Sequence, residues 1–317
     1  MGPIPAVAGY PQHSGSSLSL PILSNHMLVR LYQATVFGEI STTEYTGELA
    51  RGGDTIVFRK EPNINIREGG GLGSTIRHDH AQWDGKTFTI GRTAYFSLAC
   101  DPLDDRLFPN VAAQESMLME SGARKKAEYI DKTVLNEIYL SAHPRNRGDR
   151  AGRITGSFNL GKPGAPIVLN SGNILEVLTR IRGVMAEQNV NVDAEDIYMV
   201  VPPSVDVLLM NSDLKAAYFS GNGQSTYING RLPNKMAGIT MYKTNRCPLV
   251  YDAAVGGWCY VMTFGVKRAT AFASIIDFMR RVDNDSNTWL YYLQSRLAWD
   301  FFVLYPNLLG YLYVKVF

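Results

Sequence analysis

Cysteine is scarce in this 317-residue chain, and its three copies lie far apart, at Cys100, Cys247 and Cys259. No two of them have the short spacing of a zinc-ligand pair, and an odd number does not build a disulfide framework. A dominant sign of charge is also lacking, because the formal net charge is only +2. Such a balance creates no long-range field that would attract phosphates, which argues against a dedicated nucleic-acid binder.

Targeting and membrane-spanning segments are missing as well. Residues 1–5 have neither a basic region nor an apolar core, so we expect no signal peptide. The odd number and wide spacing of the cysteines separately favour synthesis in a reducing, intracellular place. The longest apolar stretch, 301–317, is interrupted by Pro306 and Gly310 and is shorter than the roughly 20 residues that cross a bilayer. We interpret this stretch as a buried strand and expect no contact with a membrane.

Hydrophobic residues are abundant, at 45% of the chain, and aromatic residues make up 11%. This composition excludes a disordered chain and suits a protein with a sizeable core. Aromatic rings also supply contact area at a low cost in side-chain entropy, which favours large protein–protein interfaces.

Two runs of alternating apolar and polar residues lie between positions 53 and 98. The apolar positions are Ile56, Phe58, Ile64 and Ile66 in the first run, and Phe88, Ile90, Ala94, Phe96 and Leu98 in the second. A period of two predicts two long strands that form a hairpin ribbon. The glycines between the runs, which we interpret as a loop hinge, are Gly69, Gly70, Gly71 and Gly73.

A two-stranded ribbon of this length is at best marginally stable alone in water. We therefore expect neighbouring subunits to cover its apolar side. The predicted inter-subunit contact residues are Ile56, Phe58, Ile64, Ile66, Phe88 and Ile90.

A long helix is predicted over residues 110–142, ended by His143 and Pro144. Its apolar stripe is narrow and consists of Ala123, Ala127, Ile130, Val134 and Ile138. A helix of about 45 Å with so narrow a stripe predicts a strut along a thin layer, covered by copies of the same polypeptide, and not a helix inside a compact core.

The following residues alternate between helix and strand signals. A helix with a wide apolar face is predicted over 173–188, a continuous apolar strand over 197–201 and a short helix over 204–210. Further strands are predicted at 238–244 and 258–264, and residues 289–317 are strand-like and aromatic. The expected fold class is therefore α+β, with a compact α/β region.

Residues with catalytic or binding chemistry form few patterns. Gly156–Pro163 has the GxxxxGK skeleton of a phosphate loop, but Pro163 replaces the Ser or Thr that would bind magnesium, and no helix follows, so we interpret it as an ordinary loop. His78 and His80 flank Asp79 without a third ligand nearby, which favours an exposed polar loop over a metal site. We expect no enzyme activity, cofactor or metal.

A cluster of four arginines follows the long helix, with one aspartate among them. It consists of Arg145, Arg147, Arg150 and Arg153. Two interpretations stay open: the cluster contacts phosphate or an acidic partner, or it is a solvated loop.

The order of an arm, a long ribbon, a strut helix, a compact α/β region and closing strands resembles the tailed-phage major capsid fold, which encapsulins and the herpesvirus capsid floor share. Three local segments add to the resemblance. They are the Gly-Asp-Thr-Ile sequence of residues 53–56, Val200-Val201-Pro202-Pro203, and the stretch from Asn229-Gly230 through Gly238 to Asn245 and Pro248.

The resemblance implies a division of the chain into five parts. These are an N-terminal arm (1–45), an extended β-hairpin loop with flanking peripheral strands (46–108), the spine helix and peripheral domain (109–165), an axial domain (166–265) and return strands of the peripheral domain (266–317).

The function that the resemblance implies is that of a major capsid protein, made in the host cytoplasm and located in the virion. It would form hexamers and pentamers of an icosahedral shell around double-stranded DNA, with weak, non-specific DNA contact. A scaffolding protein, a portal and decoration proteins would be its partners. The alternatives are an encapsulin-like compartment, a tail or baseplate protein and, more remotely, a nucleotide-binding enzyme that uses Gly156–Lys162.

Overall fold

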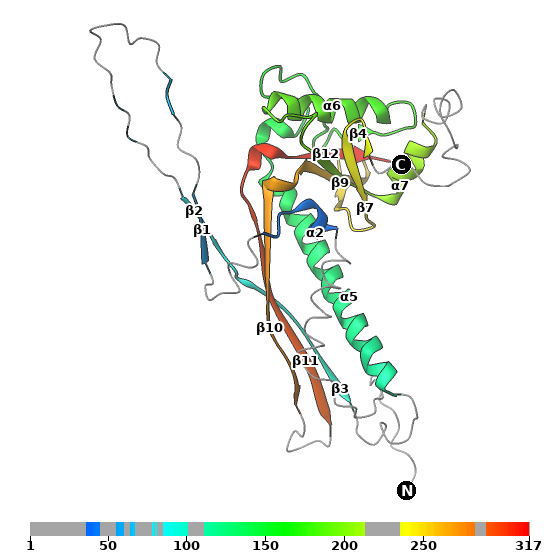
Figure 1. Cartoon of the computed structure of the whole chain (residues 1–317). Helices are drawn as coiled ribbons and strands as arrows, with labels where there is room; N and C mark the ends of the chain where they lie inside the picture. Colours follow the sequence, from blue (N-terminus) through cyan, green and yellow to red (C-terminus); the bar gives the residue numbers. More distant parts are fainter. Residues whose placement is uncertain are drawn as a thin grey trace, which may run out of the picture.

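The computed structural model of the chain describes residues 36–44, 55–59, 64–66, 78, 80, 85–100, 111–212, 235–282 and 290–316. The described elements form a two-stranded ribbon, a long three-stranded sheet with a helix beside it, and a compact body of helices and strands (Figure 1). This architecture confirms the predicted α+β fold class.

Of the four described helices, the two longer ones follow stretches with an apolar period of 3.6 residues, and the two shorter ones begin without a hydrogen bond from a capping side chain. The helices are α2 (Phe37–Ile40), α5 (Val111–Ile138), α6 (Ile174–Glu187) and α7 (Pro203–Met210). Helix α5 is the predicted long helix, and it continues into a 3-10 turn at Tyr139–Ser141. The chain is extended from Ala142 onwards, and His143 has the extended conformation that is favoured before proline.

The strands form three sheets. The ribbon pairs β1 (Thr55–Arg59) with β2 (Gly85–Thr89), and the three-stranded sheet has the order β10 (Thr270–Val282), β11 (Tyr291–Val303) and β3 (Arg92–Cys100). The seven-stranded sheet has the order β4 (Ile167–Val168), β12 (Leu309–Lys315), β9 (Gly257–Val266), β5 (Ile197–Val201), β7 (Ile239–Lys243) and β6 (Lys235–Met236), and β8 (Leu249–Asp252) pairs with β9.

The main hydrophobic core lies in the compact body. The apolar face of α6 packs there against β5, whose five residues are all buried, and against β9 and β12. Strand β12 pairs antiparallel with β9 and parallel with β4. The range 266–317 therefore does not form one set of return strands: β10 and β11 belong to the three-stranded sheet, whereas β12 completes the body.

The second predicted ribbon strand is divided in two. Residues 85–89 pair with β1, with Ile56 opposite Phe88, but residues 92–100 pair with β11 in another sheet. The division lies at Gly91, whose backbone N–H donates to the Asp300 carboxylate at 3.1 Å. The expectation of one long second strand within the ribbon is thus wrong, because Ala94, Phe96 and Leu98 belong to β3.

The apolar stripe of α5 is covered by its own chain. Ala123, Ala127, Ile130, Val134 and Ile138 are all buried, and the last four join the main core with residues of α2 and β11. The expectation that this helix finds its cover on other copies is wrong for the described residues, since the long β10–β11 hairpin and β3 lie along the helix (Figure 1).

Candidate assembly surfaces

The base of the ribbon is anchored on its own chain by aromatic rings. Phe88 is only 3% exposed, and its ring lies 5.8 Å from that of Phe302 on β11. Phe58 stacks on the same Phe302 ring at 6.2 Å, and Ile56 and Ile90 pack around the cluster. Four of the six predicted inter-subunit residues therefore contact their own β10–β11 hairpin, and the expectation that another copy buries Phe88 is wrong.

The two remaining residues of that prediction behave differently. Ile64 is 79% exposed and Ile66 is 94% exposed. Two β-branched side chains so exposed, in the segment 64–66 outside β1 and β2, are a candidate contact surface. The hinge predicted at Gly69, Gly70, Gly71 and Gly73 lies outside the described residues.

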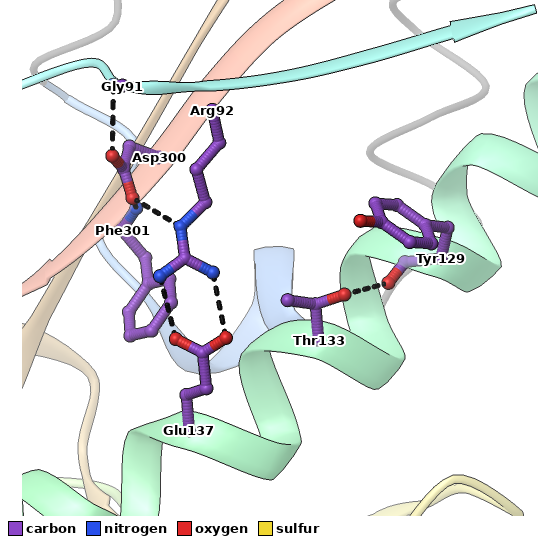
Figure 2. A network of polar contacts seen from close by, with 7 residues as sticks. All are labelled: Gly91, Arg92, Tyr129, Thr133, Glu137, Asp300 and Phe301. Carbon is purple, nitrogen blue, oxygen red and sulfur yellow. Dashed lines mark hydrogen bonds and ion pairs between the residues drawn. The ribbon is translucent and has the colours of Figure 1, made fainter.

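Arg92 links three elements where the ribbon joins the long sheet. Figure 2 shows its guanidinium between Glu137 of α5 and Asp300 of β11, with bonds of 2.9 and 2.7 Å to the two Glu137 oxygens. Its Nε lies 3.3 Å from Asp300, and its plane lies over the rings of Phe301 and Trp299. This arrangement lowers the pKa of Glu137, chiefly through the hydrogen bonds from Arg92.

Lys126 and Asp131 are charged residues on the buried side of α5. Lys126 is 6% exposed; its ammonium donates to Ser295 Oγ at 2.7 Å and lies 4.8 Å from the Phe96 ring centre. Burial lowers the pKa of Lys126 to about 8. Position 126 falls next to the apolar stripe of the sequence, between Ala123 and Ala127, and that placement is the signal that could have revealed it.

Asp131 joins α5 to two other parts of the chain. One oxygen accepts a hydrogen bond of 3.2 Å from the backbone N–H of Phe37 in α2, and the other lies 3.8 Å from Arg246, which follows β7. Arg246 also pairs with Glu128 at 3.0 Å. Burial raises the pKa of Asp131, opposed by these hydrogen bonds and by Arg246. Asp131 thereby connects α5 to α2 and to the compact body.

The four predicted arginines lie on one loop, residues 145–153, which we call the basic loop. Its backbone is fixed: the buried Asn146 donates to the carbonyls of Asn307 and Leu309, and Glu187 accepts from the N–H groups of Ile154 and Thr155 just beyond it. Three of the arginines are exposed and Arg147 is half-buried. Within the described residues, none of the four forms a salt bridge.

The GxxxxGK segment does not form a phosphate cradle. The N–H groups of Phe158, Leu160 and Lys162 bond to carbonyls of the surrounding loop, and the Lys162 ammonium pairs with Asp149 at 2.6 Å. Gly161 has a positive φ of 77°, and an added Cβ there would meet the Tyr313 carbonyl oxygen at 2.1 Å. The glycine is needed for this close approach to β12, which supports the interpretation as a structural loop.

The histidines and cysteines do not form a metal or catalytic site among the described residues. His78 and His80 are exposed, and the described residues contain no cluster of His, Cys, Asp or Glu that could hold a metal ion. The three cysteines are buried, and burial raises the pKa of the Cys247 thiol to about 12. Among the helices described, none has the length and apolar character that a bilayer crossing requires.

Neither a protein-family model nor a curated protein sequence matches this chain. Solved structures are nevertheless similar to it. A chain from Mycobacterium phage Che8 has a TM-score of 0.64 at 16% identity, over 87% of this chain and 90% of that one.

Two further similar structures are described as phage capsids. A chain of the Cyanophage P-SCSP1u capsid has a TM-score of 0.63 at 16% identity, over 99% of this chain and 93% of that one. A chain of the mature capsid of bacteriophage PhiM1 has a TM-score of 0.53 at 15% identity, over 89% and 87%. The chain thus has the fold found in tailed-phage capsids, as its sequence predicts.

Proposed function

We propose that this chain is the major capsid protein of a tailed bacteriophage, which assembles as hexamers and pentamers into an icosahedral shell around double-stranded DNA. The observation that carries the proposal is the end-to-end similarity of fold: the cyanophage capsid chain covers 99% of this chain and is itself covered to 93%. The virion would be the location of the protein, and a scaffolding protein, a portal and decoration proteins would be its partners.

The contacts of the ribbon suggest how a subunit would engage its neighbour. The Phe58–Phe88–Phe302 cluster fixes β1 and β2 on their own β10–β11 hairpin. Ile64 and Ile66 would then be buried on a neighbouring subunit, within interfaces that exceed about 2,000 Å² in permanent assemblies. In this proposal the work of the protein is association, and it needs no catalytic group.

The basic loop fits an anionic partner. None of its four arginines forms a salt bridge among the described residues, and hydrogen bonds fix the backbone of the loop that carries them. Arginine binds phosphate and carboxylate in a bidentate manner, so packaged DNA and an acidic protein surface are both chemically suited. The two partners can be distinguished by salt, because the affinity for DNA falls steeply and linearly on a log–log scale as the salt concentration rises.

Replacing the exposed ribbon residues tests the proposed function. The double variant Ile64→Ser with Ile66→Ser should stay folded, because both side chains are solvated in the subunit, but it should fail to form closed shells. Val207→Ser, which changes a similarly exposed aliphatic residue on α7, is the matched control. Negative-stain electron microscopy and circular dichroism would separate loss of assembly from loss of folding. Shells of normal shape from the double variant would contradict the assigned role of the ribbon.

A further inference from the structure

Strands β8 and β9 form a hairpin that carries exposed apolar side chains on one side. Tyr251 lies opposite Trp258 in the register, and side chains that lie opposite each other in an antiparallel pair point to the same side. Leu249, two residues before Tyr251, points to this side as well. Leu249, Tyr251 and Trp258 are 46%, 56% and 59% exposed, and the two rings meet edge to face with their centroids 5.4 Å apart. We call these three residues the hairpin face.

The hairpin face continues a side of the sheet that is buried elsewhere. Side chains alternate along β9, so Tyr260, Met262 and Phe264 point to the same side as the hairpin face. Met262 and Phe264 are buried in the main core, and Tyr260 packs against it. The apolar character of this side therefore continues past the point at which its burial within the subunit ends.

The opposite side of the hairpin is fixed to its own chain. The Asp252 carboxylate accepts hydrogen bonds from the Gly164 backbone N–H at 2.6 Å and from the Tyr313 hydroxyl at 3.2 Å. Cys259, which points to the same side as Asp252, is completely buried in a cluster with Tyr313. The backbone that carries the hairpin face is therefore anchored within the subunit, which lowers the entropy that association would cost.

The size and composition of the hairpin face fit the centre of a protein interface. Aromatic side chains bury about 150–250 Å² each, so the exposed parts of the three side chains amount to roughly 300 Å². This is less than half of the about 800 Å² that each partner contributes to a standard interface, so a partner must also contact the surface around it. Tyrosine and tryptophan are enriched among the residues that dominate binding energies.

We propose that the hairpin face packs against a second copy of this chain and is a principal contact between subunits of the shell. The inference rests on the proposed function, because the similarity to phage capsid chains favours a partner of the same kind. A subunit in a shell touches several neighbours at once, so contacts of modest area act together. DNA does not fit this face, because its three side chains are uncharged and phosphates are bound mainly by lysine and arginine.

Hydroxyl-radical footprinting of the wild-type protein, read by mass spectrometry, tests the contact directly. Tyr251 and Trp258 should be oxidised readily in the unassembled subunit and about fivefold or more slowly in closed particles, because interface cores exclude water. Trp299 is only 1% exposed and should be protected in both states, which checks that the subunits are folded. Equal oxidation of Trp258 in both states would overturn the proposal. Protection found only in particles that contain a second gene product would assign the face to that product and would overturn the proposal as well.

A double variant measures how much the hairpin face contributes to assembly. Tyr251→Thr with Trp258→Thr removes both rings but keeps residues that favour a strand, so the subunit should stay folded by circular dichroism. The protein concentration needed for particle formation should rise about tenfold or more, as expected for the loss of a dominant contact. Val250→Thr is the matched control, because it changes an exposed aliphatic residue on the other side of β8, and it should assemble as the wild type does.

The outcomes separate this inference from the proposed function. A wild-type protein that forms no closed particles would contradict the proposed function and this inference with it. Wild-type particles together with unchanged assembly of the double variant, or an equal defect in Val250→Thr, would contradict only the role of the hairpin face.

Discussion

Replacement of Arg92 by methionine should destabilise the subunit by about 2–3 kcal/mol. The variant loses two hydrogen bonds to Glu137, but these side chains are 37% and 39% exposed, so solvent screening limits their share to about 1 kcal/mol. It also takes the guanidinium away from the mostly buried Asp300, which keeps the backbone N–H groups of Gly91 and Phe301 as donors, and this lost ion pair costs about 1 kcal/mol. Loss of the cation over Phe301 and Trp299 adds about 0.5–1 kcal/mol.

The assay is urea unfolding of the unassembled subunit, followed by fluorescence, since Trp299 lies next to the replaced group. Arg124→Met is the matched control, because the described partner of Arg124 is Glu120, four residues earlier on α5, and loss of this exposed pair should cost about 0.3–0.5 kcal/mol. The folded pKa of Glu137 lies below its unfolded value. Its contribution to stability is therefore present above the unfolded pKa and is lost as the pH falls through the folded pKa. This account of the Arg92 junction would be refuted if Arg92→Met lowered the free energy of unfolding no more than Arg124→Met does and the two variants showed the same pH dependence of stability.

Three further changes probe α5, the GxxxxGK loop and the basic loop. The pKa of Lys126 is about 8 in the folded subunit against 10.5 for an ordinary lysine, so its buried charge lowers stability below pH 8, and this cost disappears as the pH rises to 10.5. In urea unfolding, Lys126→Met should therefore stabilise the subunit by about 2 kcal/mol at pH 7 and by little at pH 10.5. A destabilised variant at pH 7 would contradict this. Gly161→Ala should destabilise the subunit by about 2–4 kcal/mol, because the added Cβ would meet the Tyr313 carbonyl oxygen. Gly148→Ala is the control: Gly148 has a φ of 84° but open space around it, so this change should cost only about 1 kcal/mol. Equal midpoints of thermal unfolding for the two variants would contradict the close packing of Gly161. Replacing all four arginines of the basic loop by glutamine should reduce the steepness of the salt dependence of duplex-DNA binding, the slope of log K against log salt in filter binding, by about 3. Glutamine replacements of Arg182 and Arg268, which form ion pairs, are the controls. An unchanged slope together with failed assembly would assign the loop to an acidic protein surface.

Local periodicity predicted most of the elements. The strand at 197–201 is found as β5 with the same bounds, and the helix at 173–188 is found as α6 within one residue at each end. Both segments have an uninterrupted pattern of apolar residues, so the sequence of each segment alone is enough to predict its secondary structure. The proline restriction accounts for the extended conformation of His143, whereas α5 itself ends earlier, at Ile138, where a 3-10 turn follows.

Contacts between distant residues explain what the pattern could not predict. The second ribbon strand divides at Gly91 because the Asp300 side chain, 209 residues away, binds its N–H. The apolar stripe of α5 seemed too narrow for a core, yet a long hairpin and β3 cover it within the same chain. Strand β12 pairs with β9 and β4, a choice of partners that no local alternation encodes.

The candidate surfaces were predicted in part. The basic loop is exposed, as both of its interpretations require, so its role stays a prediction; Ile64 and Ile66, predicted as inter-subunit contacts, are exposed as well. Nothing local distinguishes these two residues from Phe58 and Phe88, because the difference depends on Phe302 of the later hairpin. The Arg92 junction was missed for the same reason, since its partners come from two distant segments, Glu137 of α5 and residues 299–301 of β11.

Electron microscopy of the purified full-length protein, produced together with the gene products encoded beside it, tests the proposed shell most directly. The account predicts closed hollow particles of uniform size whose surface resolves into rings of five and six subunits. A protein that stays a monodisperse monomer under these conditions, with the ribbon residues Ile64 and Ile66 protected inside that monomer, would contradict it.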